Sequence, residues 1–293
     1  MSAQSGSVGK QPGITLVLGG TGKTGRRVAA RLRQRNIRIR IASRSASPSF
    51  DWNEPSTWDA VLQGVAAAYV AYAPDLAIPG ASESVRAFVK RATAHGVKRL
   101  VLLSGRGEEE AQACERVVQE PDLEWTVVRA SWFMQNFSEG EFLGMVLDGA
   151  ITLPATDIPE PFIDADDIAD VAVAALTEQG HAYEIYEVTG PRLLTFRELA
   201  QEISRAVGRE VSFIQIPKEE FAEAIGVSGA PKEVAWLLSY LFETVLDGRN
   251  AHFGDGVQRA LGREPTDFAD YARRVAQAGV WNVPSSVQKA VGQ

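Results

Sequence analysis

The chain has 293 residues, of which 45% are hydrophobic and 23% charged, a balance typical of a globular protein with a large buried core. Its formal net charge of -7 argues against a general nucleic-acid binder, which would carry a basic face. Cys114 is the only cysteine, which excludes an intramolecular disulfide, and the three histidines are scattered, so we expect no metal site. No apolar run reaches the roughly 18 residues of a membrane span, and no signal-peptide core is present. We therefore expect a cytoplasmic protein with neither a membrane nor a nucleic acid as partner.

Short apolar strands alternate with helical stretches through the first half of the chain. Strands are expected at residues 14–20, 37–42, 66–73, 97–104 and 123–130, with helices between them. Because each strand is a nearly continuous apolar run, the pattern predicts a parallel sheet covered by helices on both faces. We assign residues 13–155 to an α/β domain of Rossmann type with a doubly wound parallel sheet. Residues 1–12, rich in Ser and Gly, are expected to form a disordered tail, and residues 284–293 a second tail.

The alternation loosens after about residue 130. Residues 164–176 predict a capped helix, 183–188 a strand, and Thr195 with Glu198 a capping box on the next helix. After Pro231, apolar residues recur at the spacing of one face of an amphipathic helix. We expect residues 156–283 to add late strands to the sheet and to form a small, mostly helical substrate lobe over the carboxyl ends of the strands.

A glycine-rich turn follows the first expected strand. Gly20, Gly22 and Gly25 match the G-x-G-x-x-G spacing, and Gly19 extends it to a wider one. A pyrophosphate needs backbone N–H donors at a helix N-terminus and no side chain in its path. Since this motif ends a strand and opens a helix, it predicts a dinucleotide site.

Two alternatives to that interpretation remain. Gly22, Lys23 and Thr24 spell the end of a P-loop, but such a loop also needs glycine at position 17, where Val17 lies inside the strand. The second alternative is a tight strand-to-helix turn that binds nothing.

The residues after the glycines favour NADP(H) over NAD(H). An NAD site usually places Asp or Glu about 20 residues past the glycines, to bind the ribose 2′-hydroxyl. No acidic residue occurs from Gly25 through Phe50. Arg44, beside Ser43, follows the second strand and is our candidate clamp for a 2′-phosphate, because a guanidinium binds phosphate bidentately. Other arginines in this region, Arg31 among them, are expected to form a solvated face.

The chain resembles the NmrA-like group of atypical short-chain dehydrogenase/reductases. The matching segments are VLGGTGKTGRRVAARL, ASRS, VKRLVLLSG, TVVRASWFMQNF, PFIDADDIADVAVAAL and YEVTGPRLLTFRELAQEIS. The closing stretch ALGREPTDFADYARRVAQAGVW and the LSGRGEEEA segment are similar to the ergot-alkaloid festuclavine/agroclavine dehydrogenase subfamily. The wider group includes reductases as well as regulators that bind the cofactor without turning it over.

The resemblance implies a role for specific positions. Those expected at the cofactor are, along its length, Gly19, Thr21, Gly22, Lys23, Thr24 and Gly25 at the pyrophosphate, Ser43 and Arg44 at the adenosine phosphate, Asp51 with Trp52 at the adenine, Ala73 and Pro74 at the nicotinamide ribose, and Ser104 and Gly105 at the nicotinamide. Those expected in the substrate pocket are Tyr72, Trp132, Phe133, Met134, Trp236 and Tyr240. For Trp236 and Tyr240, a place in the core of the lobe remains an equal alternative.

The sequence departs from the group at its usual acid. Typical members reduce carbonyls with a Tyr-x-x-x-Lys pair, yet none of the six tyrosines here has lysine four residues on. Ser104 and Tyr72 are the candidates for a substitute. Hydride addition to a ketone makes an alkoxide that needs a proton, whereas addition to an iminium ion needs none.

We therefore expect an NADP(H)-dependent reductase of a small electrophilic substrate, imine or iminium first and quinone-like second, acting as a monomer or homodimer. A non-catalytic NADP(H) sensor and a ketone reductase with a non-standard acid remain alternatives. Glu108, Glu109 and Glu110 either favour a cationic substrate or only form a solvated helix start. Asp164, Asp166 and Asp167 are expected to cap a helix rather than to bind metal.

Overall fold

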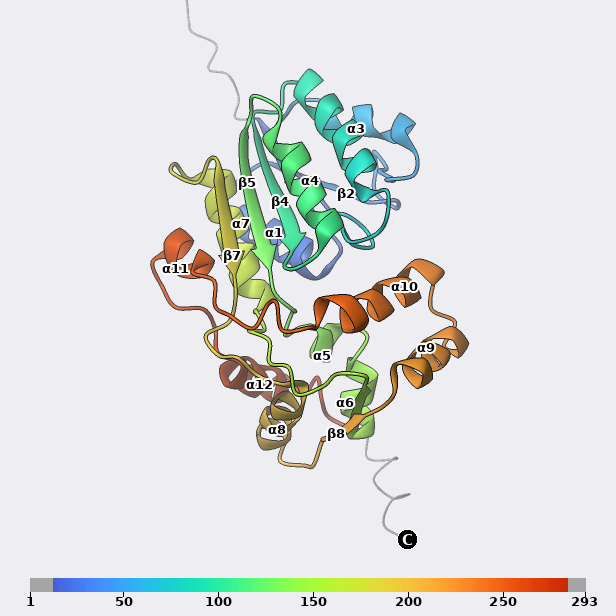
Figure 1. Ribbon diagram of the computed structural model, residues 1–293. Coiled ribbons are helices and arrows are strands. Elements are labelled where there is room, and N and C mark those ends of the chain that lie inside the picture. The colour runs from blue at the N-terminus through green and yellow to red at the C-terminus, as the bar shows by residue number, and fades with distance from the viewer. Residues whose placement is uncertain (1–12, 284–293) are drawn as a thin grey trace, which may run out of the picture.

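The computed structural model describes residues 13–283, so both expected tails, 1–12 and 284–293, lie outside the described residues. Six parallel strands form the main sheet in the order β2-β1-β3-β4-β5-β7 (Figure 1). The strands are β1 (Ile14–Leu18), β2 (Ile39–Ala42), β3 (Val65–Val70), β4 (Arg99–Gly105), β5 (Glu124–Ala130) and β7 (Glu184–Val188). The expected doubly wound Rossmann sheet is confirmed.

The register of the strands explains their apolar sequences. Leu16, Ala68 and Leu100 stand side by side on β1, β3 and β4, and each is fully buried. Their neighbours Val17 and Val101 point to the opposite face and are buried as well. Both faces are covered, so the strands are mainly apolar, and buried polar residues such as Thr15 and Ser104 are exceptions.

The chain passes from β1 to β2 on one side and then crosses to β3 on the other side of β1. Ligands of open α/β sheets bind at such a switch point, outside the carboxyl ends of the strands. β3 ends at Val70, three residues before the expected end, which leaves residues 71–74 as a loop above that edge.

Helices of the first half cover the two faces as separate layers. One face carries α2 (Trp58–Leu62), which follows a short 3-10 turn (Pro55–Thr57), with α3 (Ala81–Ala94) and α4 (Glu109–Gln119). The opposite face carries α1 (Lys23–Gln34), α7 (Ala165–Thr177) and α11 (Gly256–Leu261). Cys114 of α4 is fully buried, and burial is the main cause that raises the pKa of its thiol to about 12, which makes it unreactive near neutral pH.

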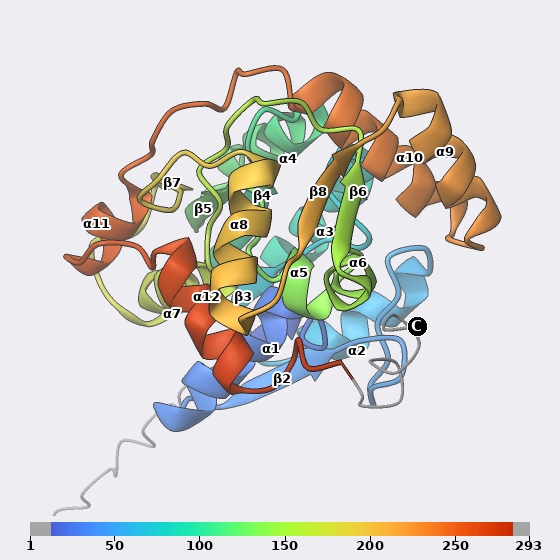
Figure 2. The ribbon, with the colours of Figure 1, turned by 90° about the horizontal axis from the view of Figure 1, so that it is seen from below.

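A second lobe lies below the carboxyl ends of the strands (Figures 1 and 2). It contains α5 (Asn136–Glu139), α6 (Leu143–Asp148), α8 (Phe196–Val207), α9 (Lys218–Val227), α10 (Lys232–Tyr240) with a π-helical turn (Leu241–Val245), and α12 (Phe268–Gln277). Aromatic rings packed edge to face, among them Phe137, Phe162 and Phe196, fill its core. The lobe is mostly helical, as expected.

The lobe also holds a small sheet that the sequence did not predict. β6 (Ala150–Leu153) and β8 (Ser212–Gln215) pair in parallel, about 60 residues apart in the chain. Elements before and after the expected boundary at residue 155 therefore interleave, because α7 and β7 return to the main sheet after β6 has joined the lobe. The described residues contain no helix that is both long and apolar enough to cross a membrane.

The aspartates at the start of α7 have structural roles. Asp164 is the N-cap of α7 and accepts hydrogen bonds from the backbone N–H of Asp166 and from Gln135. Asp167, one turn on, accepts from the backbone N–H of Thr266. Within residues 13–283, no group of His, Cys, Asp and Glu side chains is arranged to hold a metal ion. The capping box of Thr195 with Glu198 on α8 is also confirmed.

The expectation of a solvated arginine face on α1 is wrong for Arg31, which is half-buried and ion-paired. Arg31 pairs with Asp166 at 2.8 Å and with Asp170 at 2.5 Å, both in α7. Arg27 pairs with Glu139 of α5 at 2.6 Å. Single pairs of this kind contribute about 0–1 kcal/mol, but together they fix α1 against α7 and the lobe.

Glu160 is a fully buried carboxyl group at the junction of the lobe and the sheet. Its backbone pairs with Leu194, and neither of its carboxyl oxygens has a hydrogen-bond partner among the described residues. Burial raises the pKa of Glu160 to about 7, although the nearby Arg106 guanidinium opposes that shift. The native protein therefore binds a proton here that the unfolded chain gives up near pH 4.5.

Replacing Glu160 with Gln should remove a pH dependence of stability. Because the folded-state pKa is raised, the wild-type free energy of unfolding should fall as pH rises from about 4.5 to about 7. The Glu160→Gln variant should lack that fall and exceed wild type at pH 8 by roughly 3 kcal/mol. Urea unfolding across pH measures this, with the exposed Glu223→Gln as the control. An unchanged slope in Glu160→Gln would contradict the assignment.

Candidate active site

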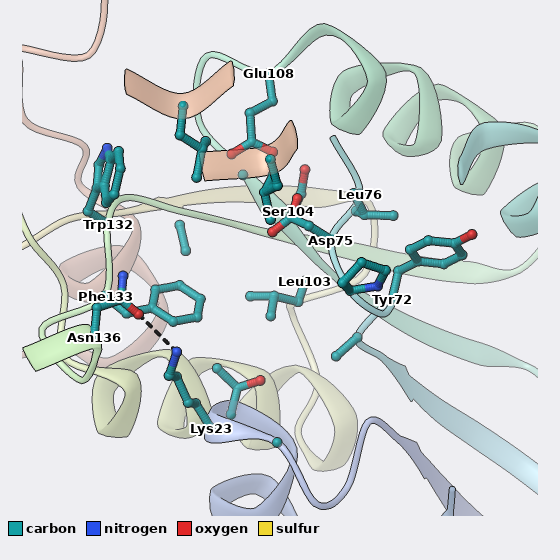
Figure 3. A pocket seen from close by; sticks show the side chains of 18 of the residues that line it. Lys23, Tyr72, Asp75, Leu76, Leu103, Ser104, Glu108, Trp132, Phe133 and Asn136 are labelled. Atoms are coloured by element: carbon teal, nitrogen blue, oxygen red, sulfur yellow. Dashed lines mark hydrogen bonds between the residues drawn. The ribbon is translucent and has the colours of Figure 1, made fainter. Parts of the chain in front are cut away.

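A cavity of about 490 Å³ lies between the carboxyl edge of the main sheet and the lobe (Figure 3). Four segments line it: the glycine turn, the loop after β3, the ends of β4 and β5, and α10 with its π-helical turn. Residues of the first three segments include Gly19, Thr21, Gly22, Lys23, Thr24, Ala73, Pro74, Ser104, Gly105, Trp132 and Phe133. The cavity is of the size usual for ligand sites, and it lies at the switch point of the sheet.

The glycines of the turn have different roles. Gly22 is the N-cap of α1, and a Cβ atom placed there would meet only the carbonyl oxygen of Gly19, at 3.3 Å. A Cβ atom on Gly25 would lie 2.2 Å from that same oxygen. Gly22 therefore leaves open space for a ligand in front of the helix N-terminus, whereas Gly25 lets the helix pack onto the turn. These are the requirements of a bound pyrophosphate.

Lys23 and Thr24 differ in what they face. The Lys23 ammonium donates a hydrogen bond to Asn136 at 3.0 Å and pairs with Glu141 at 3.4 Å, so it bridges the cavity from sheet to lobe (Figure 3). The hydroxyl of Thr24 accepts a hydrogen bond from the buried Tyr69 at 2.9 Å. Thr24 therefore anchors the start of α1, and a phosphate contact for Lys23, which lines the cavity, stays a prediction.

The residues expected at the adenosine lie outside the cavity lining. Arg44 is exposed just past the end of β2, where the fold places a 2′-phosphate. Ser43 accepts a backbone hydrogen bond from Phe50. Asp51 accepts one from the backbone of Asn53 at 2.9 Å, so its side chain shapes its own turn. Roles for these residues at the cofactor stay predictions.

Both candidates for a substitute acid line the cavity and make other contacts. The buried Ser104 hydroxyl donates to Glu115 at 2.6 Å, and Glu115 is itself paired with Arg129. The ring of Tyr72 packs on Trp52 with centroids 4.6 Å apart. Figure 3 shows the Tyr72 hydroxyl directed away from Ser104.

Three residues predicted for the substrate pocket do not line the cavity. Met134 is 1% exposed and belongs to the core of the lobe. Trp236 is 41% exposed and stacks on Tyr240, with centroids 5.1 Å apart and ring planes at 6°. Another face of α10 and its extension contributes Val234, Leu237, Leu238, Leu241 and Val245 instead. Their spacing was visible in the sequence as an amphipathic helix, and it identifies the lining better than the aromatic residues did.

Of two neighbouring carboxyl groups in the cavity, only Glu108 was considered from the sequence, and Asp75 was missed. Asp75, in the loop after β3, and Glu108, just before α4, both line the cavity (Figure 3), and their carboxyl groups interact electrostatically. Burial and the neighbouring Asp75 raise the pKa of Glu108 well above its usual range. Of the three consecutive glutamates, Glu108 faces the site and Glu109 is exposed.

The fold and the glycine turn define a dinucleotide-dependent protein of Rossmann type. Sequence models of two families match: the NmrA-like family over residues 110–272, and NAD(P)H-binding proteins over residues 19–179. The chain belongs to the NmrA-like family, and it is an NAD(P)H-dependent oxidoreductase.

Several named relatives span nearly the whole chain. The uncharacterized oxidoreductase YesF of Bacillus subtilis is 33% identical, over 91% of this chain and 96% of its own length. Agroclavine dehydrogenase of Claviceps fusiformis is 31% identical, over 87% and 95%. NAD(P)H azoreductase of Xenophilus azovorans is 30% identical, over 90% and 99%. The expected likeness to clavine dehydrogenases is confirmed.

Solved structures agree on the fold. NADPH-dependent quinone oxidoreductase of Escherichia coli, solved with NADPH, superposes with a TM-score of 0.75 at 19% identity. The match covers 89% of this chain and 99% of the other.

Gly22→Val should abolish NADPH binding without unfolding the protein, because the added side chain would occupy the open space before the helix N-terminus. Gly25→Val is the contrasting variant and should lose stability, since its Cβ atom would overlap the Gly19 carbonyl. Cofactor fluorescence titration and thermal unfolding measure the two effects. A folded Gly22→Val protein with wild-type NADPH affinity would refute the assigned cofactor site.

Arg44→Ala should remove most of the preference for NADP(H) over NAD(H). We expect NADP(H) to bind the wild type at least about tenfold more tightly, which corresponds to about 1.4 kcal/mol. Affinity for NAD(H) should change little, because that cofactor lacks the 2′-phosphate. Arg33→Ala, which removes an exposed arginine of α1, is the control for net charge. Equal losses for both cofactors would show that Arg44 is not the clamp.

Proposed function

We propose that this chain transfers hydride from NADPH to a small electrophilic organic substrate held between the sheet and the lobe. An imine or iminium carbon is the favoured acceptor, and a quinone-like ring is the second. The observation that carries the proposal is the apolar chamber beside the end of β4, formed by Leu103, Phe133 and α10, together with the missing Tyr-x-x-x-Lys pair.

The chemistry of the missing pair supports this class of substrate. A ketone that accepts hydride becomes an alkoxide, so the usual enzyme supplies a proton from tyrosine. An iminium carbon becomes a neutral amine, and a quinone spreads the new charge over its ring. Lys23, Gly22 and the N-terminus of α1 would hold the cofactor, which supplies the hydride when bound. The chain's own contribution is position, an apolar environment and local charge.

The open chamber also supports an enzyme over a cofactor sensor. A protein that only sensed NADP(H) would have no need of an apolar wall facing the cofactor turn across the cavity, and here Leu237, Leu238 and Leu241 form such a wall. Relatives named agroclavine dehydrogenase and NAD(P)H azoreductase support reduction of small organic molecules.

The protein should consume NADPH with imines, quinones or cationic dyes and turn over simple ketones poorly. Loss of general acid assistance typically costs about 100- to 10,000-fold, and this loss should fall mainly on ketones. The test follows NADPH absorbance with dihydroisoquinoline, benzoquinone, a triphenylmethane dye and acetophenone across pH. Gly22→Val is the blank for consumption without bound cofactor.

Two results would overturn the proposal. Faster turnover of acetophenone than of the other acceptors would require a carbonyl acid. Tight NADPH binding with no turnover of any acceptor would favour the sensor.

A further inference from the structure

Glu108 is a buried carboxyl group whose position at the cavity is not required by the fold. Its side chain is 7% exposed, lines the cavity, and has one oxygen, Oε2, without a partner among the described residues. The carboxyl group folds back over Gly105, where both its oxygens lie 2.3 Å from the position a Cβ atom would take. Glycine at 105 therefore makes room for the carboxyl group at the end of β4.

Glu108 is the member of the pair that more strongly favours its protonated form. Burial raises the pKa of both carboxyl groups, and the neighbouring Asp75 raises that of Glu108 further. Asp75 accepts a hydrogen bond from the backbone N–H of Ala77 at 2.9 Å, which opposes the rise at Asp75. Two neighbouring carboxyl groups therefore favour sharing one proton over ionising together.

The other charged groups near Glu108 do not oppose its protonated form. Glu115, from α4, adds a second negative charge that raises the pKa of Glu108 further. Tyr240, from α10, interacts with Glu108 and also with Arg249 in the loop that follows. Arg249 is itself paired with Asp247 at 2.7 Å, so its charge is balanced there. None of these groups offers Glu108 a cationic partner.

We propose that Glu108 is the proton donor of the reductase and that, with Asp75, it forms the recognition site for a basic nitrogen, so that the substrate class is a neutral imine. This rests on the proposed function and names its substrate. The O–H bond of Glu108 breaks first, its proton forms the N–H bond with the nitrogen lone pair, and its electron pair stays on the carboxylate, which gives an iminium ion. Hydride then forms the new C–H bond at the iminium carbon, and the π-electrons of C=N move to nitrogen and neutralise it. Solvent then restores the proton.

The charge of the pair explains why nitrogen fits and a ketone oxygen does not. Positive charge that develops on nitrogen lies beside the Asp75 carboxylate and is stabilised by it. Negative charge that develops on a ketone oxygen would be repelled by the same group. The pair is therefore an acid that works selectively on a basic atom.

Glu108→Gln keeps the shape of the side chain but removes its acidic proton. Reduction of dihydroisoquinoline should slow by at least about 100-fold. Reduction of its N-methylated iminium salt, which needs no proton, should be unaffected. Wild-type imine turnover should decline as pH rises through the pKa of Glu108, and the iminium rate should not. Glu109→Gln, at the exposed neighbouring position, is the matched control and should leave both rates unchanged.

A second measurement tests the pair without turnover. Tetrahydroisoquinoline, an ammonium ion at pH 7, should displace the shared proton when it binds the protein loaded with NADP⁺, because a nearby cation favours the ionised carboxyl group. Calorimetric titration in two buffers of different ionisation enthalpy should show about one proton released per amine bound. The Glu108→Gln variant should release none.

Failure of the role of Glu108 and failure of the proposed reductase function would give different results. Equal imine rates in wild type and Glu108→Gln, or amine binding to wild type without proton release, would overturn the role of Glu108 and leave the proposed reductase intact. If wild type reduces no acceptor at all, the proposed function fails. Proton release on amine binding then still decides whether the carboxyl pair is a nitrogen site.

Discussion

The close approach of Gly25 to the carbonyl oxygen of Gly19 fixes where α1 begins and which way it points. Because no side chain intervenes, the first turn of the helix rests directly on the end of β1, with its free backbone N–H groups at the switch point of the sheet. From there Lys23 reaches Asn136, and Arg27 reaches Glu139. The position of the lobe over the strands therefore depends on a contact that only glycine permits.

Regular parts of the fold could be predicted because their causes are local. Strands buried on both faces need continuous apolar runs, and a capping box needs only Thr195 and Glu198 three residues apart. The pairing of β6 with β8 could not be predicted, since both strands are four residues long and their partner lies far along the chain. The ion pairs of Arg31 were missed for the same reason: a basic helix face looks solvated until α7 is placed against it.

The candidate site also has one part that could be predicted from the sequence and one part that could not. The glycine turn has fixed spacing and was recognisable, whereas Asp75 and Glu108 are 33 residues apart and follow different strands. Their meeting depends on β3 and β4 being neighbours, which brings the two following loops to one edge of the sheet. Burial then excludes one of the two alternatives left for Glu108, because a residue that is 7% exposed is not part of a solvated helix start.

The carboxyl pair and the Tyr–Lys pair that is missing here are two ways to obtain an acid with a pKa near neutrality. A tyrosine is too weak an acid near pH 7, and a lysine beside it lowers its pKa. A glutamate is too strong an acid, and burial beside Asp75 raises its pKa. Both routes give a donor that holds a proton near neutrality, but the surrounding charge differs in sign. A phenol beside lysine stabilises a developing oxyanion, whereas Glu108 beside an ionised Asp75 stabilises a developing cation. Exchange of one pair for the other therefore changes which electrophile the same hydride donor and the same fold can reduce.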